Sequence, residues 1–479
     1  MSFAKKALKS GLWLAAFRLI SQTLSWVVTV TIARILAPED YGLMAMAGIF
    51  TGYAALFSEL GLGSAIIQKK EITQGELSNA FWFSFMTGGL FAAICFLLAY
   101  PAAWIFKEPR IIPITQLTSV AFVFSGLSIV PYSILNREAR FKEIGTIELL
   151  ALITANLSML GMARAHFGVW TLVWGTLILK LIMAVLICIS SKWRPGFYFR
   201  FKEAGPLLKF GLTIAGSRSL FFVFQNADKF IIGKLFNAQM LGYYSFAMQM
   251  ASIPNDKILS IFQQVFFPVL SRYQEDKPKS RELYLKVTKH IAIITFPLFF
   301  GGAFFGKEII LALLGEKWAP AIFIFRILCI AQFFLSLNVF NNIIHNAQGK
   351  PKWTLSFNLV NAILVSLSIF IAAMSGFRAL AIPWISVYPA ICITWTWITL
   401  KEQGIDMRRY LKAFCTPLMA TVFMITGIEA VQVFIMQFTI RNFKMLLLQE
   451  IAVGGILYLT YLFIFEKKSL NEIWDLRKA

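Results

Sequence analysis

Ionisable side chains lie inside long apolar stretches of this 479-residue sequence. On insertion scales a charge at the centre of a membrane costs roughly 2.5–3.5 kcal/mol, so each of these residues needs a reason. Basic side chains there can bind an anionic group, and the planar guanidinium fits phosphate oxygens in a bidentate manner. A carboxylate can instead carry a proton, because desolvation disfavours its charged form. The cations are Arg18, Lys180, Arg218, Lys229, Lys257 and Arg326, and the principal anions are Glu59, Glu148, Asp228 and Asp256.

Motifs for metal, nucleotide or redox chemistry are missing from the sequence. The cysteines are scattered through apolar stretches without a CxxC or a Cys/His cluster, which favours small hydrophobic packing residues over metal ligands. No P-loop occurs, so ATP is not expected to act on this chain directly. The sequence therefore predicts no cofactor and no metal.

Composition indicates an all-α polytopic membrane protein. The chain is 58% hydrophobic and 14% charged, whereas soluble domains carry about 45–50% and about 25%. Apolar runs of about 20 residues recur along the chain, which is the length that a helix needs to cross a bilayer. The runs predict about fourteen spans, at 11–35, 42–64, 78–106, 112–136, 143–164, 168–190, 207–235, 240–271, 285–313, 319–346, 352–374, 377–400, 411–437 and 444–465.

The distribution of basic residues predicts the orientation. With the N-terminus in the cytoplasm, about 29 of the 45 Lys and Arg residues fall in cytoplasmic segments and about 10 outside. Both termini are then cytoplasmic, and the net charge of +21 reflects topology and contact with membrane lipids rather than nucleic-acid binding. Every connection between spans is too short to hold a catalytic domain, which argues against an enzyme.

An internal repeat is visible at an offset of 200 positions. IARILAPEDYG at 32–42 is echoed by IGKLFNAQMLG at 232–242, and the same offset pairs Gly11 with Gly211, Arg18 with Arg218 and Arg34 with Lys234. Six spans separate the two copies, so both run in the same direction, as in a parallel repeat. We predict an N-terminal lobe at 1–200, a C-terminal lobe at 201–400, and a final pair of spans with a tail at 401–479.

Several segments, in this order and spacing, resemble the polysaccharide transporter family, the Wzx-type flippases of lipid-linked oligosaccharides. In the first half they are ARILAPEDYGLMAMA, FSELGLGSAIIQKKEIT and LNREARFKEIGTIELLALI, and in the second ADKFIIGKLFNAQMLGYYSFAMQMASIP, FFPVLSRYQED and NAQGKPKW. The resemblance implies a bundle of fourteen helices, like that of the multidrug (MATE) exporters, which alternates between inward-open and outward-open forms. It also implies a bacterial inner-membrane location and an undecaprenyl-pyrophosphate-linked oligosaccharide as substrate. A coupling ion and glycosyltransferase or polymerase machinery are the further partners that it suggests.

Roles for the charged residues follow from this resemblance. Arg18, Arg218, Lys180 and Lys257 are predicted to line a cationic cavity for the pyrophosphate, with snorkelling as the alternative for Arg18 and an ion pair with Glu148 as the alternative for Lys180. Asp228 and Asp256 are candidates for proton or sodium coupling, or for cross-pairing with neighbouring lysines. Glu59, Glu148, Lys229 and Arg326 are expected at gates or in structural contacts. The charged Asn255-Asp256-Lys257 stretch departs from the family pattern, which is mostly apolar or small polar here.

Two other classes of function stay open at this point. A MATE-like exporter of small cations predicts a cavity rich in carboxylates, whereas the charges within the spans are balanced; a lipid II-type flippase is the nearer alternative. A membrane glycosyltransferase, polymerase or ligase needs a large catalytic loop, which the sequence does not contain.

Overall fold

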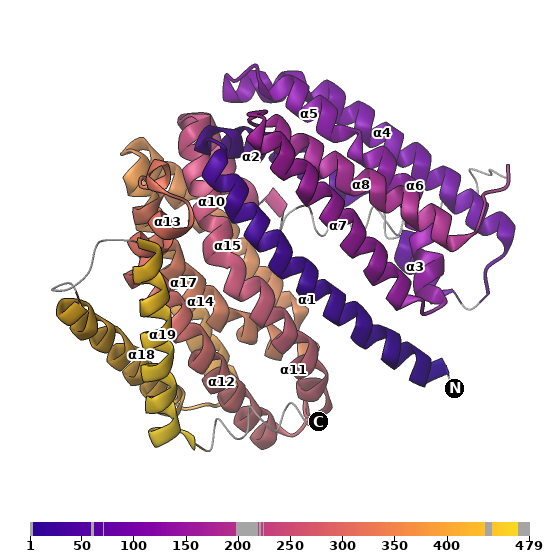
Figure 1. Cartoon of the computed structure of the whole chain (residues 1–479). Coiled ribbons are helices and arrows are strands. Elements are labelled where there is room, and N and C mark those ends of the chain that lie inside the picture. Colours follow the sequence, from indigo (N-terminus) through magenta and orange to yellow (C-terminus); the bar gives the residue numbers. More distant parts are fainter. Residues whose placement is uncertain are drawn as a thin grey trace. The chain divides into compact units, whose positions relative to one another are not determined.

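The computed structural model describes residues 3–58, 62–69, 71–197, 219, 222–223, 225–435 and 443–467, and these residues form helices and turns without a strand (Figure 1). The chain divides into two compact units, Met1–Gly242 and Tyr243–Ala479. Within the described ranges, 11 helical segments are long and apolar enough to cross a membrane. The predicted all-α polytopic membrane fold is confirmed.

The first unit is a bundle of long helices joined by short turns. In it α7 packs against α1 and α8, and α6 packs against α4 and α8. Residues 225–235 are helical as well. The helices are α1 (Phe3–Ile35), α2 (Pro38–Ser58), α3 (Leu62–Gln68), α4 (Gln74–Phe106), α5 (Ile111–Ser119), α6 (Ala121–Arg137), α7 (Phe141–Arg164) and α8 (Trp170–Ser191).

The second unit begins within α10 (Ala238–Pro254), which continues through the π-helix η1 (Asn255–Leu259) into α11 (Ser260–Arg272). Its central helix α14 packs against α12, α11 and α17, and α18 packs against α12 and α19. The remaining helices are α12 (Lys277–Phe304), α13 (Gly306–Leu313), α14 (Ala321–Ala347), α15 (Pro351–Met374), α16 (Ala381–Ile385), α17 (Val387–Gln403), α18 (Met407–Ile435) and α19 (Phe443–Phe465).

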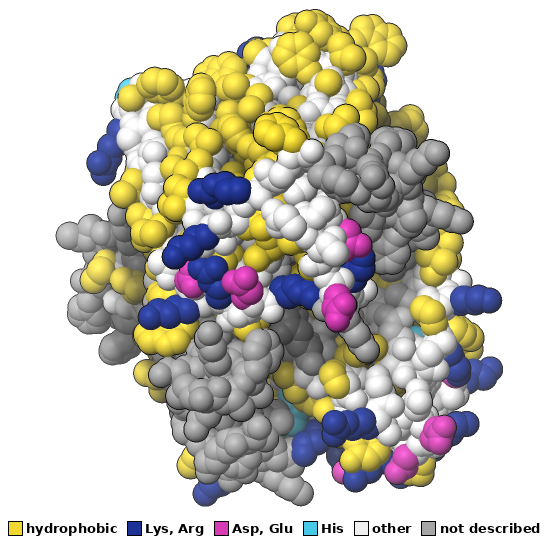
Figure 2. All heavy atoms as spheres, turned by 90° about the vertical axis from the view of Figure 1, so that its right-hand side faces the viewer, with side chains coloured by type: hydrophobic (Ala, Val, Ile, Leu, Met, Phe, Trp, Pro, Cys, Tyr) yellow, Lys and Arg dark blue, Asp and Glu magenta, His cyan; other side chains and the backbone are white. Residues whose placement is uncertain are grey.

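Large apolar side chains are exposed along many of these helices, as expected of a surface whose solvent is lipid. On α19, for example, Leu448, Ile451 and Phe463 are each more than half exposed. Figure 2 shows that hydrophobic side chains are dense over the upper part of the visible face, whereas most Lys and Arg side chains lie over its middle and lower parts.

The repeat seen in the sequence reappears as a symmetric glycine contact. A Cβ added at Gly42 of α2 would overlap the carbonyl of Ala238, and one added at Gly242 of α10 would overlap the carbonyl of Pro38. Pro38 and Ala238 are themselves separated by the 200-residue offset. The glycine of each copy therefore lies against the equivalent carbonyl of the other copy. Small residues permit backbones to approach this closely, which is how helices associate in membranes.

A second repeated feature is the turn between the fourth and fifth predicted spans of each half. In the first unit the amides of Glu138, Ala139 and Arg140 donate to the carbonyls of Ile134, Asn136 and Leu135. In the second unit the amides of Gln348, Gly349 and Lys350 donate to those of Ile344, Asn346 and His345, an offset of 210 at every position. The central residue is left-handed in both turns, with φ of 52° at Ala139 and 70° at Gly349. The motifs NREARF and NAQGKP therefore build the same turn.

We expect Gly42→Ala to destabilise the protein, because the new methyl group must push α2 away from the backbone at Ala238. Overpacking of this kind costs about 1–3 kcal/mol. The apparent melting temperature of the purified chain in detergent should therefore fall. Gly48→Ala on the same helix is the control, since a Cβ added there would meet no atom within 4 Å. An equal fall in melting temperature for the two variants would contradict the close contact at Gly42.

Gly349→Ala should also lower the melting temperature, for a different reason. The site has open space around a new Cβ, so the cost is the left-handed backbone alone, about 1–2 kcal/mol. Gly455→Ala serves as the control, because Gly455 has equal space and lies within α19 without a positive φ. It should be neutral or stabilising, and an equal loss in both variants would argue against the left-handed turn.

Candidate functional site

Arg18, a predicted cavity cation, is held by a carboxylate. Because α1 packs along α7, the guanidinium meets Glu148, with Nε to Oε2 and Nη2 to Oε1 both at 3.0 Å. The Tyr132 hydroxyl donates to the same carboxylate at 3.4 Å. The Arg18 side chain is 50% exposed and that of Glu148 is 21% exposed. Arg18 is therefore half exposed, and the Glu148 carboxylate balances its charge. The two parallel hydrogen bonds to this carboxylate are of the kind that a phosphate group also accepts.

Lys180 does not form the ion pair that the sequence allowed, since Glu148 binds Arg18 instead. It lies in the middle of α8, half-buried, and within the described part of the chain its ammonium group has no hydrogen bond or ion pair. An unpaired ammonium within an apolar helix is costly. Its predicted role as a cavity cation stays a prediction.

The Asp228-Lys229 pair lies on the helical residues 225–235 of the first unit. The Lys229 ammonium donates to Asn226 Oδ1 at 3.0 Å, and the buried Asp228 carboxylate accepts from the Lys229 backbone amide at 2.8 Å. Asn226 also lines a cavity of about 620 Å³ bounded by α2, α4 and this helix. The other lining residues are apolar, so the cavity fits a hydrocarbon group better than a charged one. Its aromatic lining residues are Phe50, Tyr53, Phe57, Phe91, Phe222 and Phe230.

The Asn255-Asp256-Lys257 stretch coincides with a change of helix type. After Pro254 the chain passes into the π-helix η1, a form that often marks functional positions. The buried Asn255 amide donates to Gln332 Oε1 at 2.6 Å and to the Gln332 carbonyl at 2.9 Å, which fixes η1 to α14. Asp256 and Lys257 are exposed, and Asp256 accepts from the Ser252 hydroxyl at 3.2 Å. Sequence reasoning found the charges but not the π-helix.

Several other basic residues contact the carbonyls at helix ends. Arg326 Nη2 donates to the carbonyl of Phe304 at 3.0 Å, where α12 ends. Lys234 Nζ donates to Ile105 near the end of α4 at 2.6 Å. Arg137 Nη1 donates to Ile66 in the last turn of α3 at 3.0 Å. The last carbonyls of a helix have no partner within it and carry partial negative charge, so these side chains are structural caps. Arg326 therefore makes a structural contact with the end of α12.

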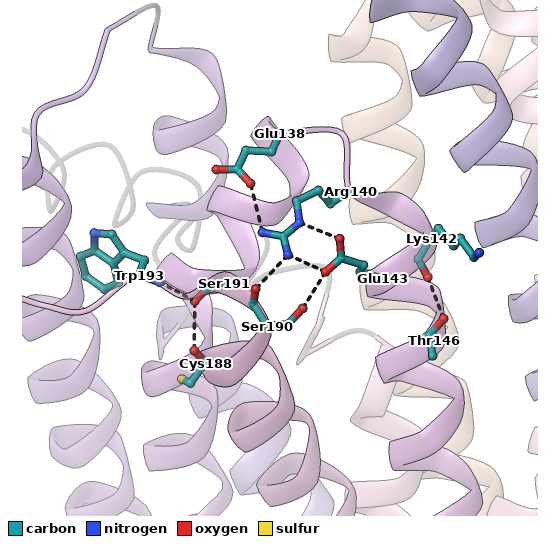
Figure 3. A network of polar contacts seen from close by, with 9 residues as sticks. All are labelled: Glu138, Arg140, Lys142, Glu143, Thr146, Cys188, Ser190, Ser191 and Trp193. Carbon is teal, nitrogen blue, oxygen red and sulfur yellow. Dashed lines mark hydrogen bonds and ion pairs between the residues drawn. The ribbon is translucent and has the colours of Figure 1, made fainter.

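Arg140, in the motif NREARFKE, joins three elements (Figure 3). Its guanidinium bonds to Glu143 through Nε at 2.8 Å and Nη2 at 2.5 Å, to Glu138 at 3.2 Å and to the Ser190 carbonyl at the end of α8 at 2.9 Å. The Ser190 hydroxyl donates to Glu143 at 2.8 Å. The bond to Glu143 is the main cause that raises the pKa of Arg140 above its ordinary value. This residue locks the repeated turn to the sixth predicted span.

The equivalent base in the second unit, Lys350, binds Glu402 on α17. Glu402 also lies 3.3 Å from Nδ1 of the fully buried His345, whose Nε2 is 3.1 Å from the Thr399 hydroxyl. The imidazole stacks on Trp353, with ring centroids 5.5 Å apart. Periodicity in the sequence does not reveal this buried polar layer, because its members are widely separated along the chain.

Arg218 and Glu59 lie outside the described residues. Among the other predicted cations, the structure brings Arg18 to Glu148 and Arg326 to a helix end. Lys180, Lys257, Asp228 and Asp256 lie at the positions given above, and their functional roles stay predictions.

Comparison with known proteins adds a family match. The family model described as "Polysaccharide biosynthesis protein" matches residues 31–323, more than half of the chain. The lipopolysaccharide biosynthesis protein WzxC of Escherichia coli is 24% identical over 87% of this chain and 86% of its own length. The teichuronic acid biosynthesis protein TuaB of Bacillus subtilis is 24% identical, covering 85% of each chain. The succinoglycan biosynthesis transport protein ExoT of Rhizobium meliloti is 22% identical over 95% of this chain and 92% of its own.

Solved structures share the fold. The lipid II flippase MurJ in an inward closed conformation superposes with a TM-score of 0.72 at 18% identity, covering 96% of this chain and all of that one. An inward-facing multidrug MATE transporter gives a TM-score of 0.62 at 15% identity over 80% of this chain and 94% of its own. The expected MATE-like architecture is therefore confirmed.

We expect Arg18→Leu to destabilise the chain by roughly 1–3 kcal/mol, because Glu148 is left without its main partner. The double variant Arg18→Leu, Glu148→Leu should recover most of that loss, which thermal unfolding of the purified chain in detergent can measure. Lys180→Leu is the matched control, since it removes a cation of a neighbouring helix without leaving an acid unpaired. A double variant less stable than Arg18→Leu would contradict a direct pairing.

Proposed function

Because the chain belongs to the polysaccharide biosynthesis protein family, we propose that it is a flippase for lipid-linked oligosaccharides. It carries undecaprenyl-pyrophosphate-linked repeat units of an O-antigen, capsule or exopolysaccharide from the cytoplasmic to the periplasmic leaflet of a bacterial inner membrane. The family match over residues 31–323 carries this proposal. The names of WzxC, TuaB and ExoT, which refer to polysaccharide biosynthesis or transport, support it.

The physical demand on such a protein is a path for a charged, hydrated head group. Pyrophosphate and sugars cannot cross bare hydrocarbon, since every unmatched polar group costs several kcal/mol there. In our proposal Arg18, Lys180, Arg218 and Lys257 supply the cations. The phosphate replaces Glu148 at Arg18, because both ligands accept the same two parallel N–H bonds.

Alternating access and ion coupling complete the proposed mechanism. Asp228 and Asp256 are the proposed sites for a proton or sodium ion, which would reset the carrier after release. Both termini lie in the cytoplasm in this proposal, in accord with the distribution of Lys and Arg. The family and the shared fold support a transporter rather than an enzyme. The MATE-like fold keeps export of small molecules as the alternative.

Surface polysaccharide should be lost when both repeat-related arginines are removed. In a flippase-deletion strain complemented with the Arg18→Ala, Arg218→Ala variant, we expect less than about a tenth of the normal polymer, since each bidentate phosphate contact contributes about 1.5–3 kcal/mol. Immunoblots of membrane fractions must show equal protein. The double variant Arg18→Leu, Glu148→Leu should stay folded yet export poorly. Full export from both variants would refute the cationic path.

A further inference from the structure

The α4–α5 hairpin of the first unit carries a groove with two different ends. Near the turn a cavity of about 460 Å³ is lined by Lys107 and Lys234 together with Tyr100 and Trp104. Further along the same two helices an apolar cavity of about 700 Å³ is lined by residues that include Phe96, Leu97, Leu117 and Val120. The residues on α4 recur at helical spacing from Ala92 to Lys107, so both cavities lie along one face of that helix.

The ammonium groups at the first end are available to an anion. Lys107 follows the last residue of α4, is exposed, and has no side-chain hydrogen bond or ion pair within the residues that the structure describes. Lys234 donates one of its three N–H groups to Ile105 and lies 5.8 Å from the centre of the Trp104 ring. Among the described residues, no carboxylate forms an ion pair with either lysine.

The neighbouring carboxylates are already engaged by a different base. Arg110 binds Glu39 at 2.5 Å and Glu108 at 2.7 Å. Its hydrogen bonds hold the pKa of Glu108 below the ordinary value, so the acid stays charged and paired. Because Arg110, Lys107 and Lys234 outnumber the two carboxylates, the mouth of the groove keeps a net positive charge.

The walls of the groove change from interfacial to apolar with depth. Trp104 is 80% exposed and Tyr100 is 55% exposed, which is the pattern of aromatic residues at a membrane–water boundary. Phe96 and Leu97, one to two turns deeper, are also exposed. From Lys107 to Ala92 the helix rises about 22 Å, which exceeds the roughly 15 Å of hydrocarbon in one leaflet. A soluble anion would make no favourable contact with these apolar side chains, whereas the acyl chain of a lipid would pack against them.

We propose that this groove is a binding site for an acidic phospholipid. The phosphate of the head group lies between Lys107 and Lys234, and an acyl chain follows α4 and α5 into the apolar cavity. The lipid is a partner of the protein in the membrane rather than its transported substrate, and the site does not depend on the proposed flippase activity.

Native mass spectrometry of the full chain, released from detergent in the presence of dioleoylphosphatidylglycerol or dioleoylphosphatidylcholine, tests this proposal. We expect the acidic lipid to be retained preferentially, and the Lys107→Gln, Lys234→Gln variant to lose that preference. A basic residue near a membrane surface contributes about 1 kcal/mol, or about fivefold, so the two together should change retention by about thirtyfold. Lys401→Gln is the matched control, because Lys401 lies 5.4 Å from the Trp397 ring in a similar pair on α17.

Further arms separate the head group from the tail. Ala93→Phe, which fills the apolar cavity, should weaken retention of the dioleoyl lipid without changing that of dihexanoylphosphatidylglycerol. Inorganic pyrophosphate should compete poorly, because it lacks a chain. The proposal is overturned if Lys401→Gln lowers retention as much as the double variant. Equal retention of both dioleoyl lipids, or full competition by pyrophosphate, would overturn it too.

Discussion

The structure depends on one constraint, which is that the carbonyls at the C-terminal end of each helix must find donors where water is scarce. Basic side chains meet this demand at five places in the described chain. All of them except Arg194, which lies just after α8, come from an element other than the helix they cap and so also join two elements. The capping residues are Arg137 for α3, Arg140 and Arg194 for α8, Lys234 for α4 and Arg326 for α12. Part of the large positive charge therefore serves the fold.

The same constraint explains why the two halves keep similar turns while their sequences diverge. A chain that ends one long helix and starts the next must satisfy the same carbonyls with the same left-handed residue, whether that residue is Ala139 or Gly349. It must also supply a base at the following position, and both Arg140 and Lys350 do so. Sequence identity at other positions can be lost, because any apolar side chain can face the lipid. Backbone geometry thus preserves the repeat better than side-chain identity does.

The helices and the repeat could be predicted from the sequence, because apolar length and glycine placement are local signals. The predicted spans 143–164 and 168–190 lie within two residues of α7 and α8. Polar contacts could not be predicted in the same way. Arg18 and Glu148 are 130 positions apart, and the sequence suggested Lys180 as the partner of Glu148. The π-helix after Pro254 was also missed; its first residue, Asn255, contacts Gln332 on α14, 77 positions away. These features involve contacts between residues far apart in the sequence, and the hydrophobic periodicity carries no information about such contacts.

Sorting the basic residues by what they contact sharpens the functional question. Arg326 contacts the carbonyl at the end of α12, and its loss from that position would leave the carbonyl without this donor, which argues against Arg326 as a ligand for the transported phosphate. Arg18 differs, because its partner is a carboxylate that can exchange for another oxyanion at little cost in geometry. A paired Arg18 also lets the empty carrier avoid an uncompensated cation in an apolar surrounding. In the proposed function, substrate would compete with Glu148 for Arg18, so the affinity for phosphate would be set by a difference between two bidentate contacts. A strong ion pair in the empty form would then favour release.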